Sequence, residues 1–217
     1  MSKLIVTAFV TLDGVMQAPG GPGEDVDGGF EYGGWQVPYT DQDFMGIMQT
    51  AFEQSADHLL LGRKTYDIFA AYWPRVTDEN NSIAVKLNGM PKYVASRTLS
   101  GLEWHNSRLL KGDAAESVAE LKERLDGVIM TQGSSDLIRT LQRHDLVDEY
   151  RLLVNPVIIG TGKRLFAEGA APVAWKITES RVTGAGVQYC VYERAGKPEY
   201  GSFLLDEEGA DEGADEG

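Results

Sequence analysis

The stretch "HLLLGRKTYDIF", from His58 to Phe69, decides the fold class because it joins a buried strand directly to a helix. Three consecutive leucines are typical of a strand covered on both faces, and the Gly-Arg-Lys-Thr that follows them opens an amphipathic helix. A turn of this kind exposes unpaired backbone N–H groups and the positive end of the helix dipole at one edge of a sheet. The stretch therefore predicts an α/β protein, and it leaves open what Arg63 and Lys64 do at that edge.

Apolar, β-rich runs alternate with amphipathic runs along most of the chain, which is the pattern of strands joined by helical crossovers. We predict strands at residues 3–10, 57–62, 92–96, 102–106, 127–133, 148–160, 175–183 and 187–195. We predict helices at residues 41–55, with Thr40 as the N-cap, from about Lys64 onward, and at 113–125 and 134–144. No helix separates the last three strands, so the end of the sheet should contain antiparallel strands.

Composition indicates one soluble domain over residues 1–200. The chain has 217 residues, of which 42% are hydrophobic, enough for one sizeable core. Its one cysteine, Cys190, cannot form an intramolecular disulfide, which suits a reducing, cytoplasmic setting. No apolar run approaches the roughly 20 residues of a membrane helix, so no membrane partner is expected.

The acidic charge is concentrated at the C-terminus. The last twelve residues, "DEEGADEGADEG", account for seven of the thirteen net negative charges and contain no apolar side chain larger than alanine. Such a segment cannot offset its ordering entropy, so we predict a disordered acidic tail over residues 201–217. Basic residues are not clustered either, and nucleic acid is not an expected partner.

Candidate phosphate-binding groups follow three of the predicted strands. Gly62 to Thr65 come first, Ser96 and Arg97 follow the strand "KYVAS", and residues 133–135 (Gly-Ser-Ser) lead into a helix. Ligands of open α/β sheets gather at the carboxyl ends of strands, and phosphates bind helix N-termini. Each signal is weak by itself, since Gly-Ser-Ser is also an ordinary helix start and exposed cations are usually only solvated. Together they favour a dinucleotide that carries an extra phosphate.

At this point the sequence resembles the dihydrofolate reductase-like superfamily, and within it the reductase domain of the bacterial riboflavin-biosynthesis deaminase-reductase and its stand-alone relatives. The resemblance rests on five segments: "VTLDGVMQAP", "LLLGRKTYDIFAAYWP", "KYVASRTL", "VIMTQGSSDLIRTL" and "VDEYRLLVNPVIIGTGKRLF". They span about residues 10–166 in the family's order. The resemblance implies a mostly parallel eight-stranded sheet with an antiparallel C-terminal strand and helices on both faces.

The resemblance also implies NADPH as the cofactor, lying across the strand ends. The residues expected to bind it are Gly62, Arg63, Lys64, Thr65, Ser96, Arg97, Gly133, Ser134 and Ser135. Ser96 and Arg97 would lie near the adenosine 2′-phosphate and the last three would hold the pyrophosphate. One departure is that dihydrofolate reductases proper have two or three glycines where this chain has Gly133, Ser134 and Ser135.

Candidates for the reducing end come from the loop after the first strand. The resemblance places nicotinamide and substrate there, so Asp13 is a candidate catalytic group and Gly14 and Gln17 are candidate substrate contacts. Asp13 is equally well explained as the first residue of an Asp-Gly turn. Asp43, with its neighbour Asp41, occupies the helix that supplies a pterin-binding carboxylate in dihydrofolate reductases proper, although acids in a first helical turn are ordinary dipole partners.

The long Gly/Pro-rich segment of residues 18–38 could be a lid, with Trp35 as a substrate contact, or a surface insertion. Lys163 and Arg164, in "IGTGKRLF", are candidate contacts to a substrate phosphate. The three histidines lack ligand spacing, so no metal site is expected.

These observations predict an NADPH-dependent reductase acting on a small heterocycle. The resemblance suggests 5-amino-6-(5-phosphoribosylamino)uracil or a related pyrimidine of riboflavin biosynthesis, and a homodimer. Two alternatives stay open: a nucleotide-binding protein without turnover, and a flavin- or deazaflavin-dependent oxidoreductase on the same fold.

Overall fold

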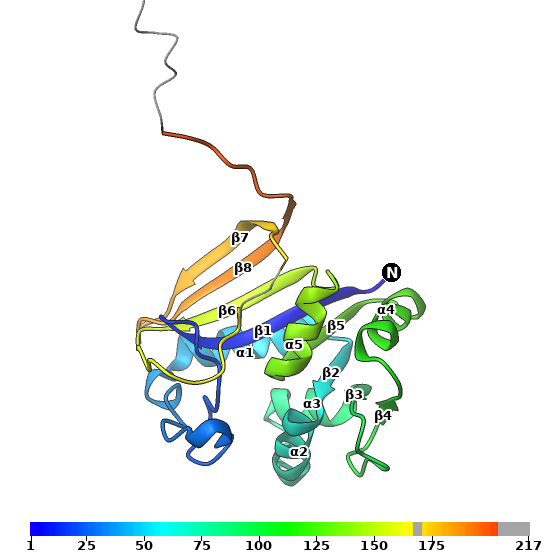
Figure 1. The fold of residues 1–217 in the computed structure, drawn as a ribbon. Helices are drawn as coiled ribbons and strands as arrows, with labels where there is room; N and C mark the ends of the chain where they lie inside the picture. Colours follow the sequence, from blue (N-terminus) through cyan, green and yellow to red (C-terminus); the bar gives the residue numbers. More distant parts are fainter. Residues whose placement is uncertain (167–170, 204–217) are drawn as a thin grey trace, which may run out of the picture.

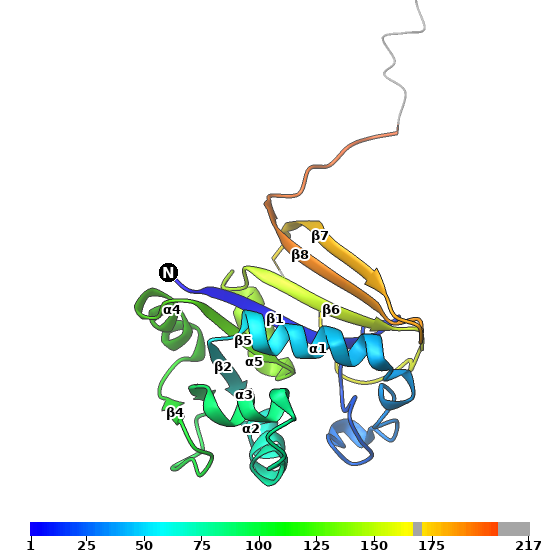
Figure 2. The same ribbon diagram turned by 180° about the vertical axis from the view of Figure 1, so that it is seen from behind.

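The computed structural model describes residues 1–166 and 171–203, which form an eight-stranded sheet with helices on both faces (Figure 1, Figure 2). Its strands are β1 (Lys3–Thr11), β2 (His58–Gly62), β3 (Lys92–Ala95), β4 (Ser107–Leu110), β5 (Val128–Gln132), β6 (Glu149–Asn155), β7 (Ala174–Val182) and β8 (Gln188–Gly196). The α-helices are α1 (Gln42–Ser55), α2 (Arg63–Tyr72), α3 (Ser82–Gly89), α4 (Ala114–Arg124) and α5 (Ser135–Arg143). Short 3-10 helices are η1 (Asp27–Gly29), η2 (Val37–Tyr39) and η3 (Trp73–Arg75).

The strand order is β4-β3-β2-β5-β1-β6-β8-β7. Neighbouring strands from β4 to β6 pair in parallel, whereas β8 runs antiparallel to both β6 and β7. This arrangement confirms the predicted mostly parallel sheet with an antiparallel last strand. Because the parallel strands end at the same edge, the turns that follow β1, β2, β3 and β5 lie close together.

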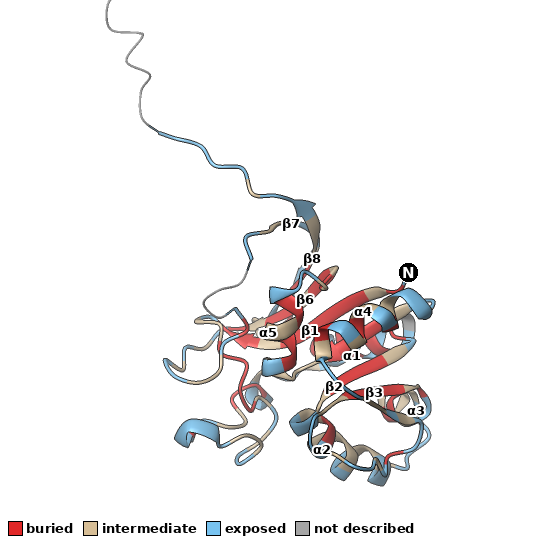
Figure 3. Ribbon diagram, turned by 45° about the vertical axis from the view of Figure 1, so that its right-hand side comes forward, coloured by how far each residue is buried: buried red, intermediate tan, exposed pale blue. Residues whose placement is uncertain are grey.

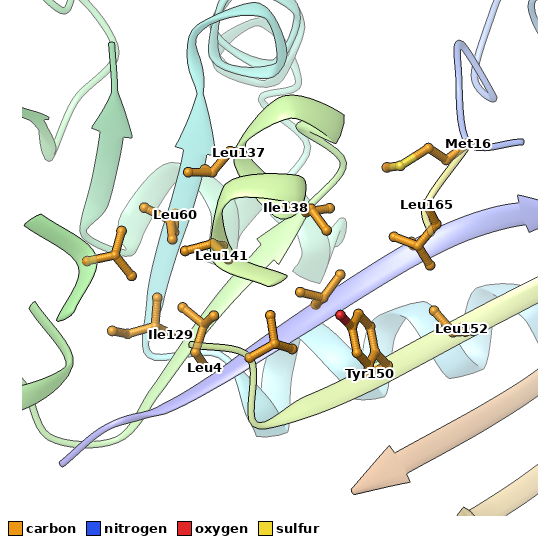
Figure 4. Packing of buried hydrophobic residues seen from close by; sticks show 14 of the residues in the cluster. Leu4, Met16, Leu60, Ile129, Leu137, Ile138, Leu141, Tyr150, Leu152 and Leu165 are labelled. Atoms are coloured by element: carbon orange, nitrogen blue, oxygen red, sulfur yellow. The ribbon is translucent and has the colours of Figure 1, made fainter. Parts of the chain in front are cut away.

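The three leucines of β2 contribute to the hydrophobic core on both faces of the sheet. Leu60 joins the cluster formed with α4 and α5, while Leu59 and Leu61 join the cluster on the other face with α1, α2 and α3. All three are fully buried, as are most residues of the central strands (Figure 3). Figure 4 shows Ile138 and Leu141 of α5 packed over the sheet. Burial of this kind anchors the helix starts at the sheet edge.

Two predicted strands have different bounds in the structure. Residues 102–106 are not a strand, and β4 begins at Ser107. Trp104 is buried instead, and its backbone N–H and ring Nε1 donate to Tyr66 Oη (3.0 Å) and Asn88 Oδ1 (2.9 Å). The predicted strand 148–160 ends at Asn155 because Pro156 has no N–H with which to continue the ladder.

Two features of the helices were also predicted wrongly. Helix α3 was not predicted, and the N-cap of α1 is Asp41, whose carboxylate accepts the N–H of Phe44 at 2.7 Å, rather than Thr40. None of the helices within the described residues has the length and hydropathy needed to cross a bilayer. The predicted acidic tail lies outside the described residues from position 204 onward.

Candidate active site

The carboxyl ends of the central strands open onto a cavity of about 1550 Å³. Its lining includes Gly62 after β2, Ser96 after β3 and Gly133 after β5, so the three predicted phosphate-binding segments meet there. The Gly/Pro-rich segment borders the same cavity through residues such as Pro19 and Gln36. Pockets for one drug-sized ligand are usually about 300–1,000 Å³. The volume therefore leaves room for a dinucleotide and a second molecule.

Helices α2 and α5 begin at this cavity without a capping side chain. Gly62 precedes α2 and Ser134 precedes α5, and neither position supplies a side-chain acceptor to the first turn of its helix. By contrast, α1, α3 and α4 are capped by the side chains of Asp41, Asn81 and Asp113. The first-turn N–H groups of α2 and α5 are thus left for an anion, which the positive ends of the helix dipoles also favour.

The hydroxyl of Ser134 joins the two uncapped turns. It accepts the N–H of Gly62 at 2.8 Å and donates to Thr65 Oγ1 at 2.9 Å. A Cβ atom at Gly62 would lie 3.2 Å from both Cβ and Oγ of Ser134, a shorter distance than in most real Cβ contacts. The absence of a side chain at Gly62 therefore lets the turns before α2 and α5 approach each other. Ser134 itself has a positive φ of 70°. The hydroxyl of Ser134 therefore holds the two turns together.

Two arginines border the cavity without a carboxylate partner. Arg63 and Arg97 are both exposed and line the cavity. Arg63 Nη1 donates to Thr98 Oγ1 at 3.3 Å. Ser96 shapes the loop between them, since its hydroxyl accepts the N–H groups of Thr98 and Leu99. Within the described residues neither guanidinium forms a salt bridge, so both can take a phosphate.

Lys64 is placed differently from its neighbour. Its ammonium group pairs with Asp27 and, at 3.6 Å, with Asp25, both in the Gly/Pro-rich segment. Lys163 binds the same two carboxylates, at 2.5 Å from Asp25 and 2.8 Å from Asp27. The hydrogen bonds from Lys163 and Lys64 lower the pKa of Asp27 to about 2. In this structure Lys64 therefore fastens the Gly/Pro-rich segment to α2, whereas the sequence predicted a phosphate ligand.

Gln17 organises the part of the cavity wall beside the Gly/Pro-rich segment from a buried position. Its side-chain NH₂ donates to the carbonyls of Asp25 and Asp27, both at 3.0 Å, and its Oε1 accepts the N–H of Lys163 at 3.0 Å. Gln17 lies in the cavity wall, and its predicted contact with the substrate stays a prediction. Trp35 is buried behind it, and its Nε1 donates to the Gln17 carbonyl at 2.7 Å. Trp35 supports the segment and does not line the cavity.

Asp13, Gly14 and Asp43 also lie outside the cavity lining. The carboxylate of Asp13 accepts the hydroxyl of Thr11 at 2.6 Å and the N–H of Gly160 at 2.8 Å, so it pins two loops together. Gly14, with a φ of 79°, completes that turn. Asp43 accepts the N–H of Gly184 at 3.2 Å, at the β7–β8 turn. The geometry gives no support to the predicted assignment of Asp13 and Asp43 as catalytic residues.

Sequence reasoning did not assign the apolar wall of the cavity. Its members are Phe44, Met48 and Phe52 of α1, Phe69 of α2, Trp73 of η3 and Ile83 of α3. Helical spacing cannot identify such a wall, because a helix face that lines a cavity has the same period as one that packs against a sheet. Within the described residues there is no cluster of three or more His, Cys, Asp or Glu placed to hold a metal.

Comparison with known proteins gives a consistent family assignment. The family model described as the RibD C-terminal domain matches residues 2–189. The protein YyaP of Bacillus subtilis (strain 168), described as uncharacterized, is 30% identical over 192 residues, covering 88% of this chain and 94% of YyaP. YwjB of the same organism, also described as uncharacterized, is 24% identical over 137 residues, or 63% of this chain and 74% of YwjB.

Solved structures show the same fold. A putative riboflavin biosynthesis protein from Shewanella sp. PV-4 has a TM-score of 0.61 at 20% identity, covering 88% of this chain and 98% of its own. A pyrimidine reductase-like protein from Corynebacterium diphtheriae has a TM-score of 0.61 at 12% sequence identity. The match covers 89% of this chain and 92% of that protein's chain. Dihydrofolate reductase from Enterococcus faecalis, complexed with NADP(H) and RAB-propyl, has a TM-score of 0.57 at 14% sequence identity. The match covers 89% of this chain and 96% of the reductase chain. The predicted dihydrofolate reductase-like fold is thereby confirmed.

Proposed function

Because the chain belongs to the RibD C-terminal domain family, whose members are reductases, we propose that it is an NADPH-dependent reductase that acts on a small heterocycle. A reductase-type function follows from the family, and the choice of NADPH rests on the cavity. The observation that carries it is the meeting of two uncapped helix starts with two arginines that have no carboxylate partner.

The residues present fit the chemical groups of NADPH. The first-turn N–H groups of α5 suit the pyrophosphate, and Arg63 and Arg97 suit the 2′-phosphate, which rewards paired guanidinium contacts. When bound, the cofactor supplies a hydride from its dihydronicotinamide ring. The chain's part is to orient the two ligands and to exclude water. Gln17 and the Gly/Pro-rich segment serve the second purpose because they cover the reducing end.

The test is a titration of the protein with NADPH and with NADH, followed by tryptophan fluorescence. We expect NADPH to bind at least about tenfold more tightly than NADH, since charge-assisted hydrogen bonds contribute about 1.5–3 kcal/mol each. Arg63→Ala and Arg97→Ala should each remove most of that preference. Arg124→Ala is the matched control, because Arg124 is exposed in the last turn of α4 and does not line the cavity.

Other outcomes would favour the alternatives. Failure of both nucleotides to bind would overturn the proposal and direct the search to flavins or deazaflavins. Tight NADPH binding without oxidation by any heterocycle would favour a nucleotide-binding protein without turnover.

The narrower substrate, a phosphoribosylamino-pyrimidine of riboflavin biosynthesis, stays a prediction. Its phosphate would need an available cation near the substrate end. The two cations expected there are engaged elsewhere: Lys163 with Asp25 and Asp27, and Arg164 with Asp13 at 3.4 Å. The predicted homodimer also stays a prediction.

A further inference from the structure

One end of the cavity has a lining that is almost entirely apolar. We call the space bounded by Phe44, Met48, Phe52, Phe69, Trp73 and Ile83 the apolar compartment; all six line the same cavity as the phosphate-binding turns. Phe9 of β1 closes it from the sheet side, with its ring centroid 5.5 Å from that of Phe44. The rings of Phe69 and Trp73 meet edge to face, 6.2 Å apart. Aromatic walls of this kind suit a flat ligand.

The six residues that bound this compartment are uncharged, and the charged residues of the described cavity lining, such as Glu24, Asp25 and Lys64, come from other segments. The acids at the start of α1 are used on the opposite side, where Asp41 accepts the N–H of Ala185 at 2.7 Å and Asp43 that of Gly184. From Ile68 onward, the described lining residues of α2, η3 and α3 carry no charge. Burying a phosphate, carboxylate or ammonium group here would leave it unpaired, at a cost of several kcal/mol.

The polar groups at the compartment's edge are neutral. Gln36 is buried and lines the cavity, and its Nε2 donates to Thr40 Oγ1 at 3.0 Å. An amide and a hydroxyl in this position can exchange hydrogen bonds with a ring nitrogen or a ring carbonyl. They would orient a heterocycle without requiring it to carry a charge.

We propose that the substrate of this site is an uncharged, planar aromatic heterocycle that carries no phosphate group. This inference rests on the proposed function for the hydride source, and it narrows the substrate class. In the reaction a ring carbon gains the hydride while the dihydronicotinamide is oxidised to nicotinamide. The ring heteroatom takes its proton from water, because the acids of the cavity lining are not among the residues that bound the compartment; of these acids, Glu24 accepts the N–H groups of Gly20 and Gly21, and Asp25 pairs with Lys163.

The test compares three probes by calorimetry, in the presence and absence of NADP⁺. Quinoxaline is the neutral planar heterocycle, quinoxaline-2-carboxylate is its charged counterpart, and uridine 5′-monophosphate represents a phosphorylated pyrimidine riboside. We expect quinoxaline to bind, the carboxylate to bind at least about tenfold more weakly, and the nucleotide not to bind. Equal or tighter binding of either charged probe, or no binding of quinoxaline, would overturn the inference.

Two variants test whether the probes bind in the apolar compartment. Trp73→Ala should weaken quinoxaline binding at least fivefold, whereas Tyr200→Ala, an exposed tyrosine outside the lining, should leave it within twofold. Met45→Lys places a cation at the rim, where the side chain is 47% exposed and folding should tolerate it. This variant should improve the affinity for quinoxaline-2-carboxylate at least fivefold. An unchanged affinity in a folded Met45→Lys protein would contradict the assigned compartment.

The nucleotide titration separates the two proposals. Binding of NADPH without binding of quinoxaline would reject the substrate class and keep the reductase. Binding of quinoxaline without binding of NADPH would reject the proposed function and keep an apolar ligand site.

Discussion

The side chains of Lys64 and Lys163 bind the same carboxylate, that of Asp27, although they lie about a hundred residues apart in the chain. Asp25 takes part in the same cluster through both lysines. The cluster ties the start of α2 and the loop after β6 to the Gly/Pro-rich segment. Lys64, which the sequence predicted to bind phosphate, therefore holds the segment that borders the cavity.

Asp27→Asn should strengthen NADPH binding by about three- to tenfold at low salt, because it releases positive charge beside the phosphate site. The gain should shrink in 0.5 M salt, where exposed charges are screened. Fluorescence titration at both salt concentrations measures it, and Asp67→Asn, an exposed change on α2 that faces no described cation, is the control. Weaker binding by Asp27→Asn would mean that the fastened segment is itself required.

Asp13→Asn should lower the free energy of unfolding by about 1–2 kcal/mol and leave NADPH affinity unchanged, because the carboxylate joins two loops and does not line the cavity. The hydrogen bond from Thr11, with those from Gly160 and Ile159, lowers the Asp13 pKa to about 2. A lowered folded-state pKa adds stability above about pH 4 that is lost as the pH falls toward 2. Urea unfolding should show the wild-type advantage disappearing in that window; a constant difference would contradict the assignment.

Ser134→Ala and Ser134→Gly separate two effects at one position. Both remove the hydroxyl that links Gly62 to Thr65, but glycine also relieves the positive φ of 70°. We expect the alanine variant to be less stable than the glycine variant by about 1 kcal/mol, which thermal unfolding can measure. Equal stabilities would show that the left-handed conformation is not strained here.

Lys92→Met should destabilise the protein by about 2–4 kcal/mol. The ammonium group is fully buried and donates to the carbonyls of Leu87, Asn88 and Met90 at the end of α3, at 2.8–3.1 Å. Urea unfolding measures the loss. Lys86→Met is the control. Lys86 lies in α3 and is not fully buried, so this change should alter the free energy of unfolding by less than about 0.5 kcal/mol.

The pH dependence of Lys92 has the same sign as that of Asp13, but it lies at alkaline pH. Burial lowers the Lys92 pKa to about 8 from 10.5. The unfolded chain then holds the proton more tightly than the folded protein, so wild type should gain stability relative to Lys92→Met as the pH rises from 8 to 10.5. A flat difference across this range would contradict the lowered pKa.

The local pattern of apolar residues and glycine turns was enough to predict most of the strands and helices of the fold. The leucines of β2 are buried toward both faces, and the strand-turn-helix segments around Gly62 and Gly133 lie where they were predicted. The predictions failed where a tertiary contact overrides local preference. The burial of Trp104 against Tyr66 and Asn88 displaced a strand, and this pairing has no signal in neighbouring residues.

The sequence by itself determined the α/β class, the family and the turns that meet at the cavity, because strand periodicity, helix starts and glycine turns are local properties. Only the tertiary structure decided which charges are available. Arg63 and Lys64 are adjacent in sequence, yet one lies at the cavity without a carboxylate partner and the other is paired with Asp27. The partners of a charge come from distant segments, and their distances depend on how the loops fold back over the sheet.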